Sequence, residues 1–286
     1  MEIRLAKTAG FCFGVDRAVK LTYGLLDEGR KVATLGPLIH NPQTVEDLER
    51  RGALVADTPA DVPTGYEVVI RSHGVPRSIY DELDARGCTY HDATCPFVKK
   101  IQKIASEAEA AGAVLVVAGD ASHPEVQGIM GWASGPVTVV HTAEEAESFV
   151  PENGKPISIV AQTTFNYNKF KDLVEILCKK RYDNNVLNIL NILNTICNAT
   201  EERQKEAKNI AGEVDTMLVV GGRHSSNTQK LFEICKKECG NTYYIQTPVD
   251  LDSEMFQCSS YVGITAGAST PKKIIEEVQE HVRIKF

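Results

Sequence analysis

Three cysteines at equivalent places in the chain constrain its fold more than any other feature. Each directly precedes a segment with helical periodicity, and each is followed 24 positions later by a glycine that ends an apolar run. The cysteines are Cys12, Cys95 and Cys197, and the glycines are Gly36, Gly119 and Gly221. A pattern that recurs in this way predicts three homologous units of about ninety residues.

Two further sets of polar residues follow the same repeat. The first set lies 28 positions after each cysteine and consists of His40, His123 and Ser225. The second set lies at the ends of the next apolar runs and consists of His73, Thr163 and Ser269. We expect domain boundaries near residues 95 and 196. The predicted domains are residues 1–95, 96–196 and 197–286, with Cys95 at the first boundary.

Short runs rich in Val, Ile and Leu alternate with longer amphipathic segments, which is typical of an α/β protein. Strands are predicted at residues 32–35, 67–70, 114–117, 157–161, 216–220 and 260–264. Helices are predicted at residues 16–28, 45–51, 98–111, 168–180, 201–211 and 271–282. Open α/β sheets bind ligands at the carboxyl ends of their strands. Three such units around a pseudo-threefold axis would bring the cysteines and polar residues to one centre, unless the spacing is a coincidence among buried cysteines.

Charge and the N-terminus exclude several classes of function. The net charge is -7, from 31 Lys and Arg against 38 Asp and Glu, and no block of basic residues occurs. We therefore expect no nucleic-acid partner and no anionic-membrane partner. The apolar run at residues 113–118 is far shorter than the roughly 18 residues of a membrane helix. Residues 1–7 lack the pattern of a signal peptide, which predicts a cytoplasmic location.

The cysteines indicate a metal centre. In a reducing compartment, eight cysteines favour metal or redox chemistry over structural disulfides. Three converging thiolates suit an iron–sulfur cluster or zinc, but structural zinc sites need a fourth ligand and use ligands close together in sequence. These cysteines are 83 and 102 residues apart, which favours a four-iron cluster with one open, Lewis-acidic iron. A cysteine nucleophile with a histidine base is the competing interpretation, although no cysteine lies in a recognisable nucleophile motif.

The remaining cysteines fall outside the repeat. We expect them to be small core or surface residues. They are Cys88, Cys178, Cys235, Cys239 and Cys258.

The polar residues of the repeat lie in an anion-binding context. Proline follows His40, His73, His123 and Ser269 within three residues, where it is typical of helix starts. Helix starts offer amide N–H groups and a positive dipole end, and the run Ser225, Ser226 and Asn227 adds hydroxyl and amide donors. These groups would replace the missing basic residues around a phosphate or diphosphate. The alternative for each histidine alone is a capping or solvated residue.

Glu125, two residues past His123, is the clearest carboxylate for proton transfer near the predicted centre. Exclusion of water there is expected to raise its pKa towards a useful donor value. The alternative is a glutamate that only stabilises the dipole of the helix it begins.

The motifs around the three cysteines resemble those of the 4-hydroxy-3-methylbut-2-enyl diphosphate reductase family. They are Ala-Gly-Phe-Cys-Phe-Gly-Val at residues 9–15, Asp-Ala-Thr-Cys-Pro at residues 92–96 and Asn-Thr-Ile-Cys-Asn-Ala-Thr at residues 194–200. Further matches occur at residues 35–41, 71–74, 123–125, 161–164 and 265–269, so the resemblance covers nearly the whole chain.

The resemblance implies a three-domain trefoil around a 4Fe-4S cluster with an open fourth iron site. It implies reduction of an allylic alcohol diphosphate to isopentenyl and dimethylallyl diphosphate, with a ferredoxin or flavodoxin as electron donor. Cys12, Cys95 and Cys197 would ligate iron, and Glu125 would deliver the proton with the assistance of His123 and Thr163. The diphosphate would be held by His40, His73, His123, Thr163, Ser225, Ser226, Asn227 and Ser269.

One stretch departs from the family pattern, and one other class of protein fits the same residues. The stutter at residues 187–194 adds several residues before Cys197 and is expected to bulge or to lengthen a loop. The alternative class is a phosphate sensor that carries an iron–sulfur or zinc site without turnover. Glu125 discriminates between the two, because a sensor needs no proton donor beside the metal.

Overall fold

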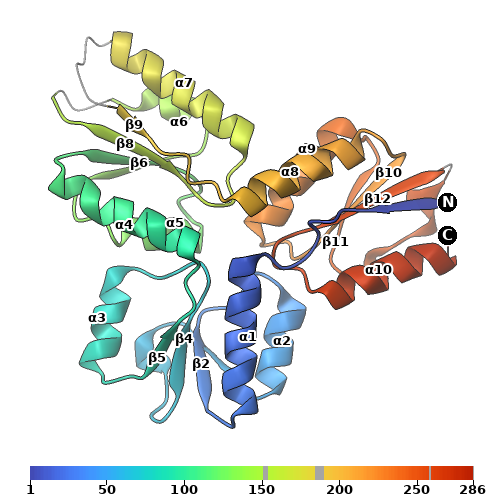
Figure 1. The fold of residues 1–286 in the computed structure, drawn as a ribbon, viewed down its shortest axis with the longest axis horizontal. Coiled ribbons are helices and arrows are strands. Elements are labelled where there is room, and N and C mark those ends of the chain that lie inside the picture. Colours follow the sequence, from blue (N-terminus) through green and yellow to red (C-terminus); the bar gives the residue numbers. More distant parts are fainter. Residues whose placement is uncertain (151–153, 184–189, 258, 286) are drawn as a thin grey trace. The chain divides into compact units, whose positions relative to one another are not determined.

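The strands among the described residues form three separate four-stranded sheets in which all pairs are parallel. The structure is a computed structural model that describes residues 1–150, 154–183, 190–257 and 259–285. Parallel strands need crossover connections, and the amphipathic helices between the strands provide them (Figure 1). The predicted α/β class with three similar units is confirmed.

The first sheet has the strand order β3-β2-β4-β5. Its strands are β2 (Val32–Leu35), β3 (Leu54–Ala56), β4 (Glu67–Ile70) and β5 (Tyr90–Asp92). The helices of this part of the chain are α1 (Phe13–Asp27), α2 (Pro42–Arg50) and α3 (Arg77–Ala85), with a 3-10 turn η1 (Pro59–Asp61).

The second sheet repeats this order as β7-β6-β8-β9. Its strands are β6 (Val114–Ala118), β7 (Val137–Val140), β8 (Ile157–Ala161) and β9 (Leu190–Ile192). Its helices are α4 (Pro96–Ala110), α5 (Pro124–Met130), α6 (Ala143–Ser148) and α7 (Tyr167–Asp183).

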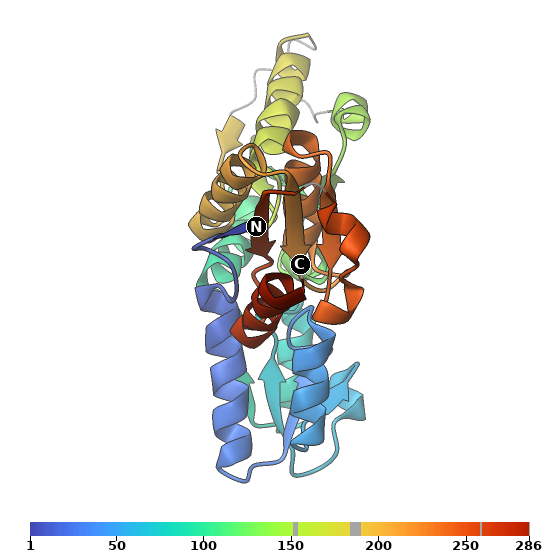
Figure 2. The ribbon, with the colours of Figure 1, turned by 90° about the vertical axis from the view of Figure 1, so that its right-hand side faces the viewer.

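The third sheet is completed by the first strand of the chain. Its order is β11-β10-β12-β1, so β1 takes the edge position that β5 and β9 take in the other sheets (Figure 1 and Figure 2). Its strands are β1 (Glu2–Leu5), β10 (Thr216–Val220), β11 (Thr242–Ile245) and β12 (Tyr261–Ala266). Its helices are α8 (Asn198–Ala211), α9 (Ser226–Glu238) and α10 (Lys272–Lys285), with 3-10 turns η2 (Pro248–Asp250) and η3 (Ser253–Phe256).

Central strands are buried on both faces because helices cover each side. Leu115 and Val117 of β6 pack with residues of α4 and α5, whereas Val116 and Ala118 pack with residues of α7. The same alternation along β10 divides its side chains between α10 on one face and α8 with α9 on the other. Burial on both faces explains why these strands are continuous apolar runs.

The described residues divide into two compact units. The first unit comprises residues 1–24, 37–53 and 198–286 and contains the sheet with β10 and β12. The second unit comprises residues 25–36 and 54–197 and contains the other two sheets. The predicted boundaries of three domains near residues 95 and 196 stay a prediction.

The six predicted strands are all present, and all of them are central strands of their sheets. The sequence analysis predicted none of the six edge strands, which have three or four residues and partly exposed side chains. It expected helix starts after His73, after His123 and at Ser225 but assigned no residue range to α3, α5 and α9, and it missed α6. Short, half-exposed elements carry too few apolar residues for periodicity to reveal them.

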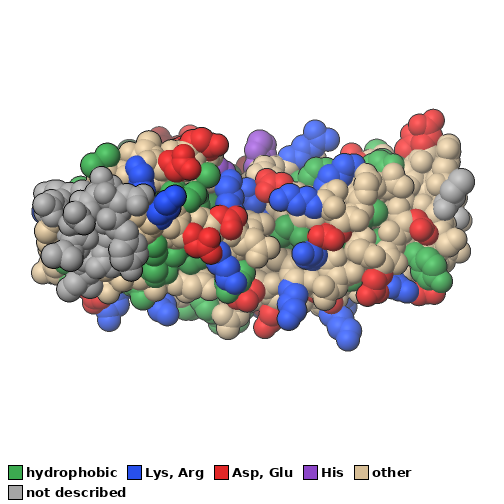
Figure 3. Space-filling view, turned by 90° about the horizontal axis from the view of Figure 1, so that it is seen from above, with side chains coloured by type: hydrophobic (Ala, Val, Ile, Leu, Met, Phe, Trp, Pro, Cys, Tyr) green, Lys and Arg blue, Asp and Glu red, His purple; other side chains and the backbone are tan. Residues whose placement is uncertain are grey.

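Charged side chains of both signs lie on the surface. On the face that Figure 3 shows, blue Lys and Arg side chains alternate with red Asp and Glu side chains. Within the described part of the chain, no helix has the length and apolar character that crossing a membrane requires.

Candidate functional site

The three cysteines occupy the same structural position in each repeat. Each follows an edge strand, β1, β5 or β9, and directly precedes a helix, α1, α4 or α8. The backbone N–H of each donates a hydrogen bond to a carbonyl in the loop after the neighbouring strand, β12, β4 or β8. The pairs are Cys12 to Ala268 at 3.2 Å, Cys95 to Ser72 at 2.9 Å and Cys197 to Thr163 at 3.1 Å. All three side chains are half-buried, and none of the three forms a disulfide within the described residues.

The loops after β2, β6 and β10 each end in a helix cap. Asn41, His123 and Ser225 are the N-caps of α2, α5 and α9, and each side chain accepts a hydrogen bond from a backbone N–H of the first turn. His40 lies one residue before its cap, because this loop is one residue longer. The expectation that His123 and Ser225 stand at helix starts is therefore confirmed. These starts provide the positive dipole end that favours an anion.

Glu125 is a buried carboxyl group held by Thr163. The backbone N–H of Thr163 donates to Glu125 Oε1 at 2.6 Å, and its hydroxyl donates to Oε2 at 2.7 Å. Glu125 is only 1% exposed. Burial raises its pKa to about 7 although both hydrogen bonds from Thr163 act in the opposite direction. The predicted rise in the pKa of this carboxyl group and its pairing with Thr163 are both present in the structure.

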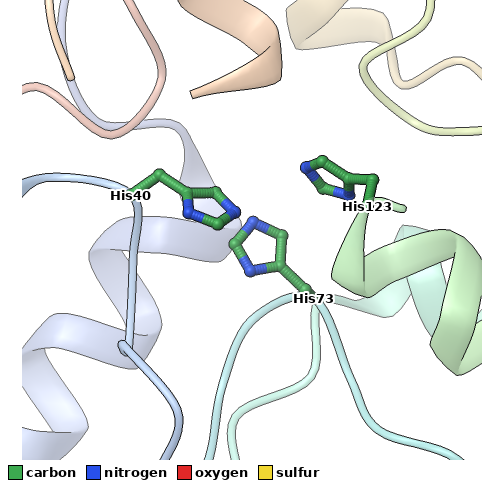
Figure 4. A group of neighbouring side chains, drawn as sticks. All are labelled: His40, His73 and His123. Atoms are coloured by element: carbon green, nitrogen blue, oxygen red, sulfur yellow. The ribbon is translucent and has the colours of Figure 1, made fainter. Parts of the chain in front are cut away.

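His73 and His123 face each other within the second unit, as Figure 4 shows. Their rings form a T-shaped pair with centroids 5.4 Å apart. One ring nitrogen of His73 lies within 4.8 Å of one ring nitrogen of His123. The backbone N–H of Glu125 donates to His123 Nδ1 at 3.2 Å. In the neutral ring the proton is then on Nε2, so His123 remains a hydrogen-bond donor without being charged.

Close packing of α5 on the loop after β4 fixes this histidine pair. A Cβ at Gly131 would clash with Pro76, and Gly128 lies against the backbone of Gly74. The carbonyl of Gly131 also accepts from the N–H of Arg77 at 3.3 Å. Because α5 begins beside His123 and this loop carries His73, the glycines on α5 and at its C-cap set the distance between the two rings.

The first unit brings the hydroxyl and amide donors together. Ser269 Oγ donates to the carbonyl of His40 at 3.3 Å and lies 3.4 Å from Ser225 Oγ. Asn227 Oδ1 accepts from the N–H of Ala268 at 2.9 Å, while its buried Nδ2 has no hydrogen-bond partner among the described residues. A buried donor in this state is costly unless a ligand accepts from it. Ser226 is the first residue of α9, directly after the Ser225 cap.

Glu125 and Asn227 occupy corresponding positions in their repeats. Both lie two residues past a helix cap, and both accept from a backbone N–H two residues beyond the third strand of their sheet. Each also lies 30 positions after its cysteine, a spacing signal that the sequence analysis did not use. One loop design thus holds a carboxyl group in one repeat and a carboxamide in the other.

The residues in the loops after β4, β8 and β12 correspond to one another in a way that the sequence did not reveal. His73 and Ser269 lie three residues beyond β4 and β12. The residue three positions beyond β8 is Thr164, not Thr163. Thr163 instead corresponds in position to Ser72 and Ala268, whose backbones also bond to cysteines or side chains of the site.

The segment before Cys197 is anchored to β8. Leu190–Ile192 forms β9 and pairs with β8, while Leu187, Asn188 and Ile189 of the stutter lie outside the described residues. Thr195 Oγ1 accepts from the N–H of Ala161 at 2.8 Å and donates to its carbonyl at 2.6 Å. These bonds fix the approach to Cys197 close to the end of the central strand.

Two of the remaining cysteines behave as the sequence predicted. Cys235 and Cys239 are buried, and burial raises the pKa of Cys235 to about 12, which suits a core residue. Cys88 and Cys178 are half-buried thiols, and Cys258 lies outside the described residues.

The described residues form an α/β protein with three parallel sheets, three cysteines at helix starts and a buried carboxyl group beside histidines. This combination defines a class of α/β proteins with residues able to bind a metal and a ligand. Residues 3–283 match the LytB protein family. The chain belongs to this family, and the resemblance identified from the cysteine motifs is confirmed.

Relatives in this family carry the name 4-hydroxy-3-methylbut-2-enyl diphosphate reductase. The protein of Caldanaerobacter subterraneus subsp. tengcongensis is 43% identical over 99% of this chain and 97% of its own length. The protein of Geobacter sulfurreducens is 45% identical, with the same coverage of 99% and 97%.

Two solved structures share the fold. One is a structure of (E)-4-hydroxy-3-methyl-but-2-enyl diphosphate reductase, described as the terminal enzyme of the non-mevalonate pathway. It is 40% identical, covers 99% of both chains and has a TM-score of 0.69. The other is an E-1-hydroxy-2-methyl-but-2-enyl-4-diphosphate reductase from Plasmodium falciparum. It is 25% identical, covers 99% of this chain and 87% of that chain, and has a TM-score of 0.89.

Proposed function

We propose that the protein is an iron–sulfur reductase that converts 4-hydroxy-3-methylbut-2-enyl diphosphate to isopentenyl diphosphate and dimethylallyl diphosphate. The reaction consumes two electrons and two protons and releases the substrate hydroxyl as water. The observation that carries the proposal is Glu125, a buried carboxyl group whose pKa is raised to about 7 and which is held by Thr163 beside His123. The identity of 43% to 45% with reductases of this name supports it.

Cys12, Cys95 and Cys197 would hold a 4Fe-4S cluster. Their chemistry fits the group, since all three are half-buried cysteines at helix starts, and cysteine sulfur is the ligand that iron–sulfur clusters use. When bound, the cluster would supply electrons and an open, Lewis-acidic iron for a substrate oxygen. A reducing cytoplasm would keep the thiols available.

The diphosphate would be bound by the donors of the three repeats. Ser225, Ser269 and the unpartnered amide of Asn227 offer neutral donors, and the start of α9 adds backbone N–H groups and Ser226. His40, His73 and His123 would add imidazole donors. Neutral donors and helix starts hold an anion without a basic patch, which agrees with a chain of net charge -7.

Glu125 and Thr163 would move the proton. A hydroxyl both donates and accepts, so the Thr163 side chain can accept from protonated Glu125 while it donates to a neighbouring oxygen. Burial raises the pKa of this carboxyl group to about 7, so it stays protonated up to about that pH, which is close to the working value of a general acid. His123, with its proton on Nε2, would orient the leaving hydroxyl without competing as an acid.

Anaerobic purification tests the proposal directly. We expect a brown protein with about four iron and four sulfide per chain, as for a single four-iron cluster, and turnover of the substrate with reduced methyl viologen. Cys12→Ser, Cys95→Ser and Cys197→Ser should each lose the colour, whereas Cys178→Ser, a half-buried thiol outside the repeat, should keep it. A colourless wild-type protein with stoichiometric zinc would refute the cluster. A brown protein without turnover would indicate a sensor instead.

A further inference from the structure

The three helices that follow the proposed cluster ligands differ in charge. Residues 96–106 of α4 contain three lysines and no acidic residue. By contrast, the first eleven residues of α1 combine Asp16 with two basic residues, and those of α8 contain three acidic and three basic residues, beginning with Glu201 and Glu202. In a chain of net charge -7, α4 is therefore the basic member of three equivalent helices.

The lysines of α4 lie on its exposed side, together with an aromatic ring. We call Phe97, Lys99, Lys100 and Lys103 the α4 face; all four side chains are exposed, and Phe97 is 41% exposed. Asp92 pairs with Lys99 at 2.6 Å, and Glu107 reaches Lys103 only at 3.7 Å. Lys100 makes no ion pair among the residues that the structure describes.

The α4 face starts at a proposed cluster ligand. The N–H of Lys99 donates to the carbonyl of Cys95 at 2.9 Å, so the face occupies the first turns of the helix. With a rise of 1.5 Å per residue, Lys103 lies about 12 Å along the helix axis from Cys95. Electron transfer rates fall steeply with distance, so a donor that contacts this face would be close to that ligand.

A depression beside the α4 face suits a protruding partner side chain. Its volume is about 290 Å³, and its lining includes Tyr80 and Trp132, the buried Gln102, and Lys99 and Lys103 together with Asp92, the ion-pair partner of Lys99. Tyr80 and Trp132 form an edge-to-face pair 5.6 Å apart, and Trp132 Nε1 donates to the carbonyl of Val75 at 3.0 Å. Rigid aromatic walls with cations at the rim are typical of protein–protein contact sites.

We propose that the α4 face and this depression dock an acidic one-electron carrier protein. The inference rests on the proposed function, because it assigns the surface through which that reaction receives its electrons. The reduced carrier is oxidised by one electron at each encounter, so two encounters supply the electron pair that, with two protons, releases one water. Charge complementarity steers such a carrier to α4 and away from the acidic start of α8. Contacts between redox partners are small and transient, which a single helix face with one depression satisfies.

Charge reversal on the α4 face tests the docking proposal. We expect the double variant Lys100→Glu with Lys103→Glu to raise the KM for a purified acidic flavodoxin roughly 10- to 100-fold at low ionic strength. The wild-type KM should rise with salt, and the variant should lose most of this dependence. Turnover with methyl viologen should stay at the wild-type rate, since a small reductant needs no docking surface. Lys99 is left unchanged to preserve its ion pair with Asp92.

A matched control is available on α10. Lys272 and Lys273 are exposed lysines whose i,i+4 partners are Glu276 and Glu277, and the Lys273 pair at 3.9 Å resembles the Lys103 pair at 3.7 Å. Lys272→Glu with Lys273→Glu makes the same change in net charge and should leave the flavodoxin KM within about twofold. An equal rise in both double variants would show a net-charge effect and overturn the assignment to α4.

A binding titration separates failure of docking from failure of the proposed function. Oxidised flavodoxin titrated with each protein reports its Kd from flavin fluorescence without any turnover. If wild type and the α4 variant bind equally, or if the variant instead changes the oligomeric state, the α4 face is not a carrier site. Absence of turnover with methyl viologen would reject the reductase activity alone. The gentler variant Lys100→Gln, which removes one charge, should raise the Kd in the same direction and guards against misfolding of the reversal.

Discussion

The loop after β6 and the loop after β10 share one design but hold different chemistry. Both end in a helix cap, His123 in one and Ser225 in the other, and both place a side chain two residues later against a backbone N–H from the neighbouring loop. That side chain is Glu125 after β6 and Asn227 after β10. The backbone of the repeat therefore provides the position, while the residue type decides whether the position holds a titratable proton or a neutral amide.

Burial has different consequences for the carboxyl group of Glu125 and the carboxamide of Asn227. Glu125 loses solvation as an anion, so its pKa rises to about 7 and the protonated form prevails below that pH. Asn227 carries no charge, and its cost is the unpartnered Nδ2 donor, which an incoming anion would satisfy. The comparison assigns acid chemistry to the first loop and anion binding to the second. The predictions below test this division.

Replacing the carboxyl group should have the largest effect. Glu125→Gln keeps the shape and the acceptor for the N–H of Thr163 but supplies no proton, so we expect kcat to fall by roughly 10²- to 10⁴-fold. Iron content and substrate Kd should persist. The measurement is single-turnover kinetics with reduced methyl viologen at full iron content. A wild-type rate in this variant would give the proton-donor role to water or to the diphosphate.

The raised pKa of Glu125 should appear in the pH dependence of stability. Its pKa is 4.5 in an unfolded chain and about 7 in the folded protein. Between these values the folded state keeps a proton that the unfolded chain has released, so this group stabilises below pH 4.5 and loses that stabilisation as pH rises through 7. The loss is about 3 kcal/mol. Urea unfolding at pH 5 and pH 8 should show that Glu125→Gln gains about 2.5 kcal/mol of this relative to wild type; a constant difference would contradict the shift.

Adding a carboxylate to the second loop should impair binding rather than chemistry. Asn227→Asp is nearly isosteric but places a negative charge where the proposed diphosphate binds. We therefore expect the Kd for the diphosphate substrate to rise about 100-fold above pH 7. The effect on kcat should be much smaller than that of Glu125→Gln. Asn209→Asp, at an exposed position of α8, is the charge-matched control. If Asn227→Asp lowered kcat and left Kd unchanged, the division of roles between the loops would be wrong.

The smallest effect concerns the glycine that lets the second loop close on His40. A Cβ at Gly222 would clash with the carbonyl oxygen of His40, and the carbonyl of Gly222 is itself held by the hydroxyl of Tyr244. Gly222→Ala should reduce the free energy of unfolding by about 1–3 kcal/mol. Gly240→Ala, where the added methyl group meets open space, should be nearly neutral. Thermal or urea unfolding of the two variants measures the contrast.

The candidate site was predictable to the extent that it follows the repeat. Constant spacing places His123, Ser225 and the three cysteines at loop positions, and a parallel α/β fold gathers such loops at the carboxyl ends of the strands. The family resemblance placed Thr163 beside Glu125, but the spacing of the repeat did not predict the hydrogen bonds between them. The pairing of Thr163 with Glu125 joins residues 38 positions apart, and nothing in the local sequence reports it.

Central strands and edge strands show the same limit. Runs such as Val114–Ala118 are apolar throughout because both faces are covered, so the sequence by itself determined the central strands and, with the cysteine spacing, the three units. Only the tertiary structure decided the edges. Glu2–Leu5 is a strand because β12 offers it a parallel partner more than 250 residues away, and Leu190–Ile192 is a strand because β8 does. Local propensity is too weak to fix such short elements; long-range hydrogen bonding, burial and the resulting pKa of Glu125 depend on neighbours that only the folded chain supplies.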